Sequence, residues 1–335
     1  MPAAHHGAIA GASALRRGAL QEAITLLTRS AQLGAQRGQP PLAQATTLRR
    51  LARAHYGTGQ LSECLATVRQ AMTVLGRPLP TAPQALRLAL ARELGIELCH
   101  RLFPPQPLTS SAERALEQEA LALALSVSEA VLTSRENLSE ALLLMLRGLH
   151  SAERVGESLG QANYLSSLGF LTYLFGAKPL SRFYMQRART QLDLAGDGRA
   201  SANYDSLSGF LSLGDAHFDA SSESIGRWLK AAERSGDQAR QGVAVGTLAA
   251  VYLAAGRLQD ADTAAERCQS VGVRIGNRQH QTSGLAFRGL VALRRGQFAL
   301  ADDLLSQALS HIEKTGSGSY RMVVEGMCSV AALRV

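Results

Sequence analysis

The side chains that could perform catalysis are scattered along the sequence rather than grouped in motifs. Eight histidines and four cysteines occur in 335 residues, and no histidine stands at a recognisable spacing from a nucleophile and an acid. Cys99 and His100 are adjacent, but neighbours on a helix point about 100° apart and rarely share a metal ion. We therefore expect solvated or capping histidines, buried cysteines, and no catalytic residue, metal or other cofactor.

Glu93 and Glu97 form a carboxylate pair four residues apart, which places both on one face of a helix. Such a pair binds metal in helical bundles when a Glu-x-x-His motif from another helix completes the site. Without a companion motif elsewhere, we predict a solvated face on which the glutamates pair with Arg92 or Arg101. No lysine follows a glycine, so the phosphate-binding loop GxxxxGK[ST] is missing and ATP hydrolysis is not expected.

The composition indicates that helices carry these side chains. Hydrophobic residues make up 46% of the chain but aromatics only 5%, and the apolar residues are mainly alanine and leucine, which favour helices. This hydrophobic content, with 19% charged residues, excludes a disordered chain. No segment approaches the roughly 18 apolar residues of a membrane span, and the N-terminus has no basic leader. We expect a cytoplasmic protein.

The chain is similar to itself at a spacing of about forty residues. The ten residues that start at Ala162 match the ten that start at Ala202 at seven positions. Self-similarity at such a period is the signature of a solenoid. A ladder of glycines, each between two helical patterns, has nearly the same spacing: Gly176, Gly214, Gly256 and Gly296.

The pattern of one repeat predicts two amphipathic helices joined at a glycine. Apolar residues recur at helical spacing over 245–252 and again over 258–268, and Gly256 stands between the two stripes. Ala249 and Ala261 are small enough to let the two helices approach closely. This pattern resembles the tetratricopeptide repeat (TPR), although the period exceeds the roughly thirty-four residues usual in that family.

We predict a single all-α domain over residues 1–335, a right-handed α-solenoid of about eight TPR-like repeats or about sixteen helices. Regular repeats are expected at 8–76 and 158–315, with an irregular section of long helices at 82–134. Within that section, prolines separate one helix at 82–103 from another at 111–133.

Three short strings carry a narrower resemblance. Residues 75–80 (Leu-Gly-Arg-Pro-Leu-Pro), 100–104 (His-Arg-Leu-Phe-Pro) and 151–156 (Ser-Ala-Glu-Arg-Val-Gly) resemble the repeat region of bacterial signal-transduction ATPases. In that class an AAA/STAND ATPase module, often behind a nucleotide-cyclase or protein-kinase domain, precedes long TPR-like repeats. The resemblance implies a TPR-like portion or relative of such a regulator, and the ATPase and cyclase modules themselves are absent from this sequence.

The positive charge is concentrated in the first third. Residues 1–110 contain twelve arginines, four glutamates and no aspartate or lysine, so their net charge of +8 equals that of the whole chain. This asymmetry fits nucleic acid, an acidic protein partner, or a solvated arginine-rich face. The arginines have no interleaved aromatics and no nucleic-acid-binding motif accompanies them, so nucleic acid is not expected. The other two interpretations stay open.

In TPR-like repeats the first helix of each pair lines a concave groove. Asparagine and aromatic side chains one turn apart on these helices suit an extended peptide, because the amide binds backbone and the ring covers side chains. In the alternative interpretation the asparagines cap or solvate and the phenylalanines fill the space between repeats. The candidate groove residues are Arg49, Arg53, Tyr56, Asn163, Ser166, Phe170, Tyr173, Asn203, Ser206 and Phe210.

The sequence thus predicts a protein-interaction or sensory scaffold that is not an enzyme. Its partner would be a protein or peptide, either of another kind or a second copy of the chain. The rival interpretation is a small-molecule-sensing or enzymatic helical domain with its pocket in the concave groove, which would need polar groups converging on an enclosed apolar cavity.

Overall fold

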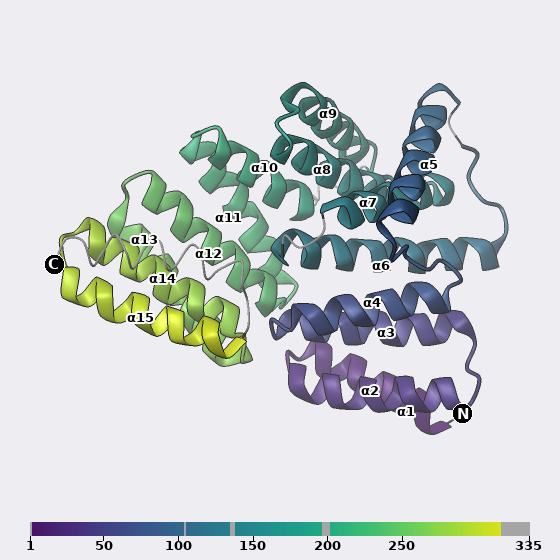
Figure 1. Cartoon of the computed structure of the whole chain (residues 1–335), viewed down its shortest axis with the longest axis horizontal. Helices are drawn as coiled ribbons and strands as arrows, with labels where there is room; N and C mark the ends of the chain where they lie inside the picture. The colour runs from purple at the N-terminus through teal and green to yellow at the C-terminus, as the bar shows by residue number, and fades with distance from the viewer. Residues whose placement is uncertain (1, 104, 135–137, 196–201, 316–335) are drawn as a thin grey trace. The chain divides into compact units, whose positions relative to one another are not determined.

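The computed structural model describes residues 2–103, 105–134, 138–195 and 202–315, and in these ranges it contains fifteen α-helices and no β-strand (Figure 1). The predicted all-α, TPR-like solenoid class is confirmed. The helices are α1 (Pro2–Arg16), α2 (Leu20–Gln36), α3 (Pro41–Gly57), α4 (Leu61–Val74), α5 (Pro83–Leu102), α6 (Ser111–Ser134), α7 (Leu138–Val155), α8 (Ser158–Leu174), α9 (Lys178–Leu194), α10 (Ala202–Gly214), α11 (Phe218–Arg234), α12 (Gln238–Ala254), α13 (Leu258–Ile275), α14 (Arg278–Arg294) and α15 (Phe298–Thr315).

The chain divides into two compact units. Unit 1 contains the residues up to 56 and residues 60–207, and unit 2 contains residues 57–59 and those from 208 onward. In unit 1, α1 packs on α2, α6 on α7, α7 on α8 and α8 on α9. In unit 2, each helix from α11 to α14 packs on the next one in the chain. Packing between consecutive helices is the arrangement predicted for TPR-like pairs, whereas a single domain over 1–335 stays a prediction.

The turns between helices repeat every twenty residues, so that each forty-residue repeat contains two equivalent helix-turn modules. A residue after the end of α7, α8 and each helix from α10 to α14 adopts a left-handed conformation with φ between 60° and 77°. Glycine is favoured there because it has no Cβ. The residues of this ladder are Gly156, Gly176, Ala216, Gly236, Gly256, Gly276 and Gly296.

The sequence-based ladder was wrong at one step. It placed Gly214 in the turn, but Gly214 is the last residue of α10 and Ala216, with a φ of 60°, takes the left-handed position. The N–H of Ala216 donates to the carbonyl of Leu213 at 3.0 Å, and that of His217 to Ser212 at 2.8 Å. These are the two hydrogen bonds of a Schellman motif, so the turn forms although its central residue has a Cβ.

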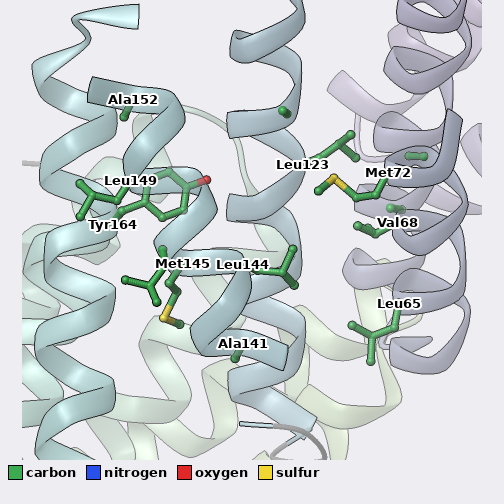
Figure 2. Packing of buried hydrophobic residues seen from close by; sticks show 14 of the residues in the cluster. Leu65, Val68, Met72, Leu123, Ala141, Leu144, Met145, Leu149, Ala152 and Tyr164 are labelled. Atoms are coloured by element: carbon green, nitrogen blue, oxygen red, sulfur yellow. The ribbon is translucent and has the colours of Figure 1, made fainter. Parts of the chain in front are cut away.

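The core of unit 1 is formed by leucine, methionine and alanine side chains from α4, α6, α7 and α8 (Figure 2). Tyr164 of α8 is one of two tyrosines buried in it, with Tyr184, and is only 1% exposed. Its ring lies against Gly148 of α7, where a Cβ would overlap the ring. The small residue therefore sets the close approach of α7 and α8, as the TPR-like pattern predicts for helix pairs.

The section that the sequence predicted as irregular contains two long helices, α5 and α6. Ser110 precedes α6 and its Oγ accepts a hydrogen bond from the N–H of Glu113 at 3.4 Å, as expected of an N-terminal cap. The loop between the helices is tied to α7, because the N–H of Leu108 donates to the carbonyl of Arg154 at 2.8 Å. Helix α7 lies outside both ranges in which the sequence predicted regular repeats.

Candidate functional site: a charged cluster beneath an exposed apolar helix face

Helix α5 differs from an ordinary surface helix, because its buried residues are glutamates and most of its leucines are exposed, although Leu90 packs against the core. Its two buried residues are Glu93 and Glu97, which are 6% and 3% exposed. Leu88, Leu98 and Leu102 are 74%, 61% and 67% exposed. The apolar stripe of a helix normally faces the core. Helix α5 packs on α7 in unit 1, and polar contacts contribute much of this attachment.

Glu93 joins α5 to α7 through two basic side chains. Its Oε2 lies 3.0 Å from Nδ1 of His150, and its Oε1 accepts a hydrogen bond from Nε of Arg147 at 3.3 Å. Burial raises the pKa of Glu93, whereas the hydrogen bond with His150 and the charges of His150 and Arg147 lower it. The lowering effects together are larger, so the pKa of Glu93 lies below its ordinary value. Glu93 is therefore ionised at neutral pH.

Glu97 joins α5 to α9 one turn later. Its Oε1 accepts hydrogen bonds from Arg101 at 3.1 Å and from Nη1 of Arg187 at 3.4 Å. Its Oε2 lies 3.7 Å from Nε2 of His150. Burial again raises the pKa of Glu97, and the contacts with His150, Arg101 and Arg187 outweigh it, so the pKa lies below its ordinary value.

His150 therefore lies between two ionised carboxylates. Its burial disfavours the charged imidazolium, but the contacts with Glu93 and Glu97 and the negative charge of Glu153 raise its pKa to about 9. An imidazole that holds its proton up to that pH cannot serve as a general base at neutral pH. His150 is therefore protonated at neutral pH and forms ion pairs with Glu93 and Glu97.

A second layer of contacts extends the cluster across α5, α7 and α9. Nδ1 of His100 lies 2.6 Å from Oε2 of Glu153. Arg101 donates to the hydroxyl of Tyr184 at 2.7 Å, and its guanidinium lies 4.8 Å from the centre of the Phe183 ring. These contacts oppose rotation of α5 about its own axis, which keeps Leu88, Leu98 and Leu102 on the outside.

The expectation of a solvated Glu93–Glu97 face was wrong, and so was that of a solvated His150, which is 7% exposed. Arg101 is a partner of Glu97 as predicted, whereas Arg92 is exposed. The further partners Arg147 and Arg187 are far along the chain from the two glutamates, which is why helical spacing alone did not reveal them. His280 is also buried rather than solvated.

Several arginines of the first third have acidic partners within unit 1. Each binds a glutamate that is largely buried, at N–O distances of 2.6 to 3.1 Å. Part of the positive charge is thus matched internally, which neither of the two open interpretations predicted. An acidic protein partner for the remaining arginines stays a prediction. The pairs are Arg49–Glu119, Arg69–Glu140, Arg77–Glu117 and Arg101–Glu97.

The polar candidates for the groove are engaged in bonds within unit 1. Asn203 donates from Nδ2 to the carbonyl of Asn163, its counterpart one repeat earlier, at 2.8 Å. Ser166 is fully buried and its hydroxyl donates to the carbonyl of Ala162 at 2.6 Å, while that of Ser206 donates to Asn203 at 2.9 Å. Asn203 therefore ties adjacent repeats together, a role that the sequence did not suggest.

The aromatic and basic candidates are more accessible. Phe170 and Tyr173 on α8 are half-buried, and Nζ of Lys178 lies 5.3 Å from the centre of the Tyr173 ring. In unit 2, the half-buried ring of Phe210 packs edge-on against Trp228 with centroids 6.5 Å apart. Of the early candidates, Arg53 is exposed. Tyr56 packs against the core of unit 1, and Arg49 binds Glu119. Peptide binding by this set stays a prediction.

Within the described ranges, no group of three or more His, Cys, Asp or Glu side chains could hold a metal ion. Cys64 and Cys268 are buried as predicted, and burial raises the pKa of the Cys268 thiol to about 12. Cys99 is exposed, contrary to prediction, because it lies on the outer face of α5. Cys328 lies outside the described residues. Among the described helices, none has the length and apolar content of a membrane span.

Comparison by sequence finds no matching protein-family model and no matching curated protein. Comparison by structure does find matches. Aspartyl phosphate phosphatase F from Bacillus subtilis aligns with a TM-score of 0.50 and 14% identity, over 98% of this chain and 79% of that one. The likeness shows a shared fold. At this identity it extends to the helical-repeat architecture and not to activity.

Two further structures align at lower similarity. A tetratricopeptide repeat protein from Parabacteroides merdae gives a TM-score of 0.47 and 11% identity, over 99% of this chain and all of that one. A Rap protein complexed with competence and sporulation factor gives a TM-score of 0.38 and 12% identity, over 97% of this chain and 74% of that one.

Proposed function

We propose that the chain is a non-catalytic protein-interaction scaffold that acts in the cytoplasm. The observation that carries this proposal is the outer face of α5, where Leu88, Leu98, Leu102 and Phe103 are each more than 60% exposed. Contiguous exposed apolar surface on a folded domain marks an interaction site. Burying it against a partner would recover roughly 25 cal/mol for each Å² removed from water.

The charged face of α5 supports the same conclusion. A helix with both polar and apolar faces could bury its leucines by rotating about its axis, but here that would pull Glu93 and Glu97 away from His150, Arg101 and Arg187. Breaking a buried ion pair by removing one partner costs about 3 to 5 kcal/mol. The ion pairs therefore present the leucines to solvent, as a docking helix requires.

The titratable groups support a role without catalysis. His150 keeps its proton up to a pKa of about 9, and burial lowers the pKa of His280 to about 4. The Cys268 thiol has a pKa of about 12, far above that of a reactive thiolate. None of these groups has the near-neutral pKa that a general acid or base needs.

A finer proposal is that this scaffold belongs to a bacterial signalling system as a portion or relative of an ATPase, cyclase or kinase regulator. Its support is the resemblance carried by residues 75–80, 100–104 and 151–156. In the first of these strings, Arg77 binds Glu117, so a structural need also accounts for that residue. An ATPase module encoded in the same or a neighbouring gene would support the proposal, and a neighbourhood of unrelated metabolic genes in all relatives would contradict it.

The experiment that tests the scaffold proposal uses Leu98→Glu with Leu300→Glu as its matched control. Both leucines are exposed on helices, α5 and α15, so both variants should melt like the wild type. Complexes should be identified by cross-linking and mass spectrometry, and binding constants measured with the purified partner. We expect Leu98→Glu to lose a complex that Leu300→Glu retains.

The proposal is contradicted if both variants bind every identified partner as the wild type does. It is also contradicted if the purified chain turns over a substrate and a single substitution within the chain removes that activity. Repurification to constant specific activity must precede that measurement, so that a contaminating enzyme is excluded.

A further inference from the structure

The exposed face of α5 has a regular pattern. Leu88, Ala91, Gly95, Leu98 and Leu102 follow one another at intervals of three and four residues, and all five are exposed. This is the spacing of a helix-packing stripe. In a surface helix such a stripe faces its own core, whereas here the core-facing side is occupied by glutamates. The stripe therefore has the pattern of a buried seam without a partner in the described part of unit 1.

Gly95 stands at the centre of this stripe, and the space around it is open. A Cβ built on it would meet nothing within 4 Å. Glycine in the middle of a helix costs about 1 kcal/mol relative to alanine. A glycine is useful at such a position when a second helix crosses close to the backbone there.

The exposed face of α5 is partly symmetric about Gly95, with Arg92 as the counterpart of Leu98. Leu88 and Leu102 each stand seven residues from Gly95, and the small residues Ala91 and Cys99 each stand four residues from it. A two-fold axis through Gly95 would therefore place Leu88 opposite the partner's Leu102, and Ala91 opposite the partner's Cys99. A surface that is complementary to itself under a two-fold rotation is the requirement for a symmetric dimer.

Two copies of α5 related by a two-fold axis across the helix would run antiparallel, and the charges on α5 favour this arrangement over a parallel one. About this axis, Arg92 would lie opposite the partner's Leu98, and Arg87 opposite the ring of the partner's Phe103. No arginine would face an arginine. In a parallel pair each residue meets its own copy, so Arg87 and Arg92 would each oppose the same charge.

We propose that α5 is a dimerisation helix on which a second copy of this chain docks antiparallel, with Gly95 at the crossing point. This proposal rests on the proposed function and names its partner at this face. The twenty-residue helix is about 30 Å long. One helix pair of that length buries less than the usual 800 Å² per partner, so the dimer should dissociate measurably at micromolar concentration.

The first test measures association by sedimentation velocity from about 1 to 100 μM, the range in which a small interface dissociates. We expect a concentration-dependent dimer in the wild type. Leu98→Arg, which would place a second positive charge opposite the partner's Arg92, and Gly95→Leu should each raise the dimer Kd by about tenfold or more. Gly95→Leu should not lower the melting temperature, because the position is open and leucine favours helices.

Gly226→Leu is the matched control for Gly95→Leu. Gly226 is also a mid-helix glycine, in α11, and a Cβ on it would likewise meet nothing within 4 Å. It lies on a helix without the leucine stripe. This variant should leave the dimer Kd unchanged, and an equal effect of both substitutions would overturn the proposal.

The second test determines whether the two α5 helices of the dimer pair antiparallel or parallel. In an antiparallel pair, Ala91→Cys would lie opposite the partner's Cys99, so mild oxidation should give a covalent dimer. Within one chain the two positions are eight residues or about 12 Å apart on the same helix, too far for a disulfide. Adding Cys99→Ser should abolish the product. A covalent dimer that survives Cys99→Ser would indicate a parallel pair or another contact and would overturn the proposal.

Failure of this proposal is distinguishable from failure of the proposed function. If the chain is a monomer at all concentrations tested and Leu98→Glu abolishes binding of a different protein, the dimer is excluded and the scaffold proposal stands. If the chain is a monomer and Leu98→Glu weakens binding of no partner, both the dimer proposal and the scaffold proposal fail. If the chain dimerises but Leu98→Arg and Gly95→Leu leave the Kd unchanged, the dimer uses another surface and the proposal fails.

Discussion

The imidazole of His150 lies against the carboxylate of Glu93, with Nδ1 3.0 Å from Oε2, in a position that is 7% exposed. Its other nitrogen lies 3.7 Å from Glu97, and the ring of His100 packs edge-on against it at 4.9 Å. Charged groups from α5 and α7 thus surround one imidazolium. The attachment of α5 to unit 1 should therefore depend on the protonation of His150.

We predict that unit 1 loses stability between pH 6.5 and 9. The folded pKa of His150, about 9, exceeds its unfolded value of about 6.5, so its contribution is complete below pH 6.5 and is lost as the pH rises through 9. The loss should be on the order of 2 to 3 kcal/mol. Urea unfolding followed by circular dichroism at several pH values measures it.

His150→Gln is the control for this prediction. The variant should be less stable at pH 7, because Glu93 and Glu97 lose their shared cation, but its stability should change little between pH 6.5 and 9. Equal pH dependence in the variant and the wild type would contradict the assignment. Below pH 5 the wild type should lose stability, since the pKa values of Glu93 and Glu97 are lowered on folding.

His280 should have the opposite effect in unit 2. It is buried and its Nε2 donates to the carbonyl of Ala239 at 3.0 Å, and burial lowers its pKa to about 4. The stability that its neutral form contributes is complete above pH 6.5 and is lost as the pH falls through 4. Trp228, the single tryptophan of the chain, lies in unit 2 and reports its acid unfolding by fluorescence.

We expect His280→Gln to shift the acid midpoint of unit 2 to lower pH, because glutamine takes up no proton. His217→Gln is the matched control, since His217 lies in the same unit and is exposed. An acid midpoint that both substitutions leave unchanged would mean that carboxylates rather than His280 determine the acid unfolding of unit 2.

The local features of the fold could be predicted from the sequence because they depend on neighbouring residues. The stripes of α12 and α13, the turn at Gly256 and the proline-bounded ends of α5 all follow from spacing within about twenty residues. Such signals do not depend on the rest of the chain, and the predicted helices agree with the structure.

The charged cluster could not be predicted because its partners are distant in sequence. Arg147 is 54 residues from Glu93, and Arg187 is 90 residues from Glu97. In α5, leucines lie on several sides of the glutamates, so periodicity does not say which face packs inward. Helical spacing placed Glu93 and Glu97 on one face correctly, but only the tertiary structure shows that this face is buried.

We predict that Ala216→Gly stabilises unit 2 by about 1 kcal/mol. A left-handed conformation costs a residue with a Cβ roughly 1 to 2 kcal/mol, and part of the gain is lost because glycine increases the entropy of the unfolded chain. Gly256→Ala, at the equivalent turn, should destabilise by a similar amount. Urea unfolding monitored through Trp228 measures both, and a neutral or destabilising Ala216→Gly would show that the turn relaxes without strain.

The last prediction concerns the half-buried phenylalanines of the groove candidates. Phe210 packs edge-on against Trp228, and Phe170 is half-buried on α8. Full burial of a phenylalanine makes its replacement by alanine cost about 3 to 5 kcal/mol, whereas an exposed ring costs well under 1 kcal/mol. We expect each alanine variant to lose an intermediate amount, about 1 to 2 kcal/mol, and Phe210→Ala also to change the fluorescence of Trp228.

Phe170→Leu and Phe210→Leu are the controls, because leucine fills much of the volume of the ring. Both should recover most of the stability, whereas binding of a peptide that stacks on the ring should stay weakened in both. A loss of 3 to 5 kcal/mol in both alanine variants, with full recovery of partner binding by leucine, would show that the rings serve packing between helices. The search for a peptide site would then move to the other accessible groove candidates, the half-buried Tyr173 and the exposed Arg53.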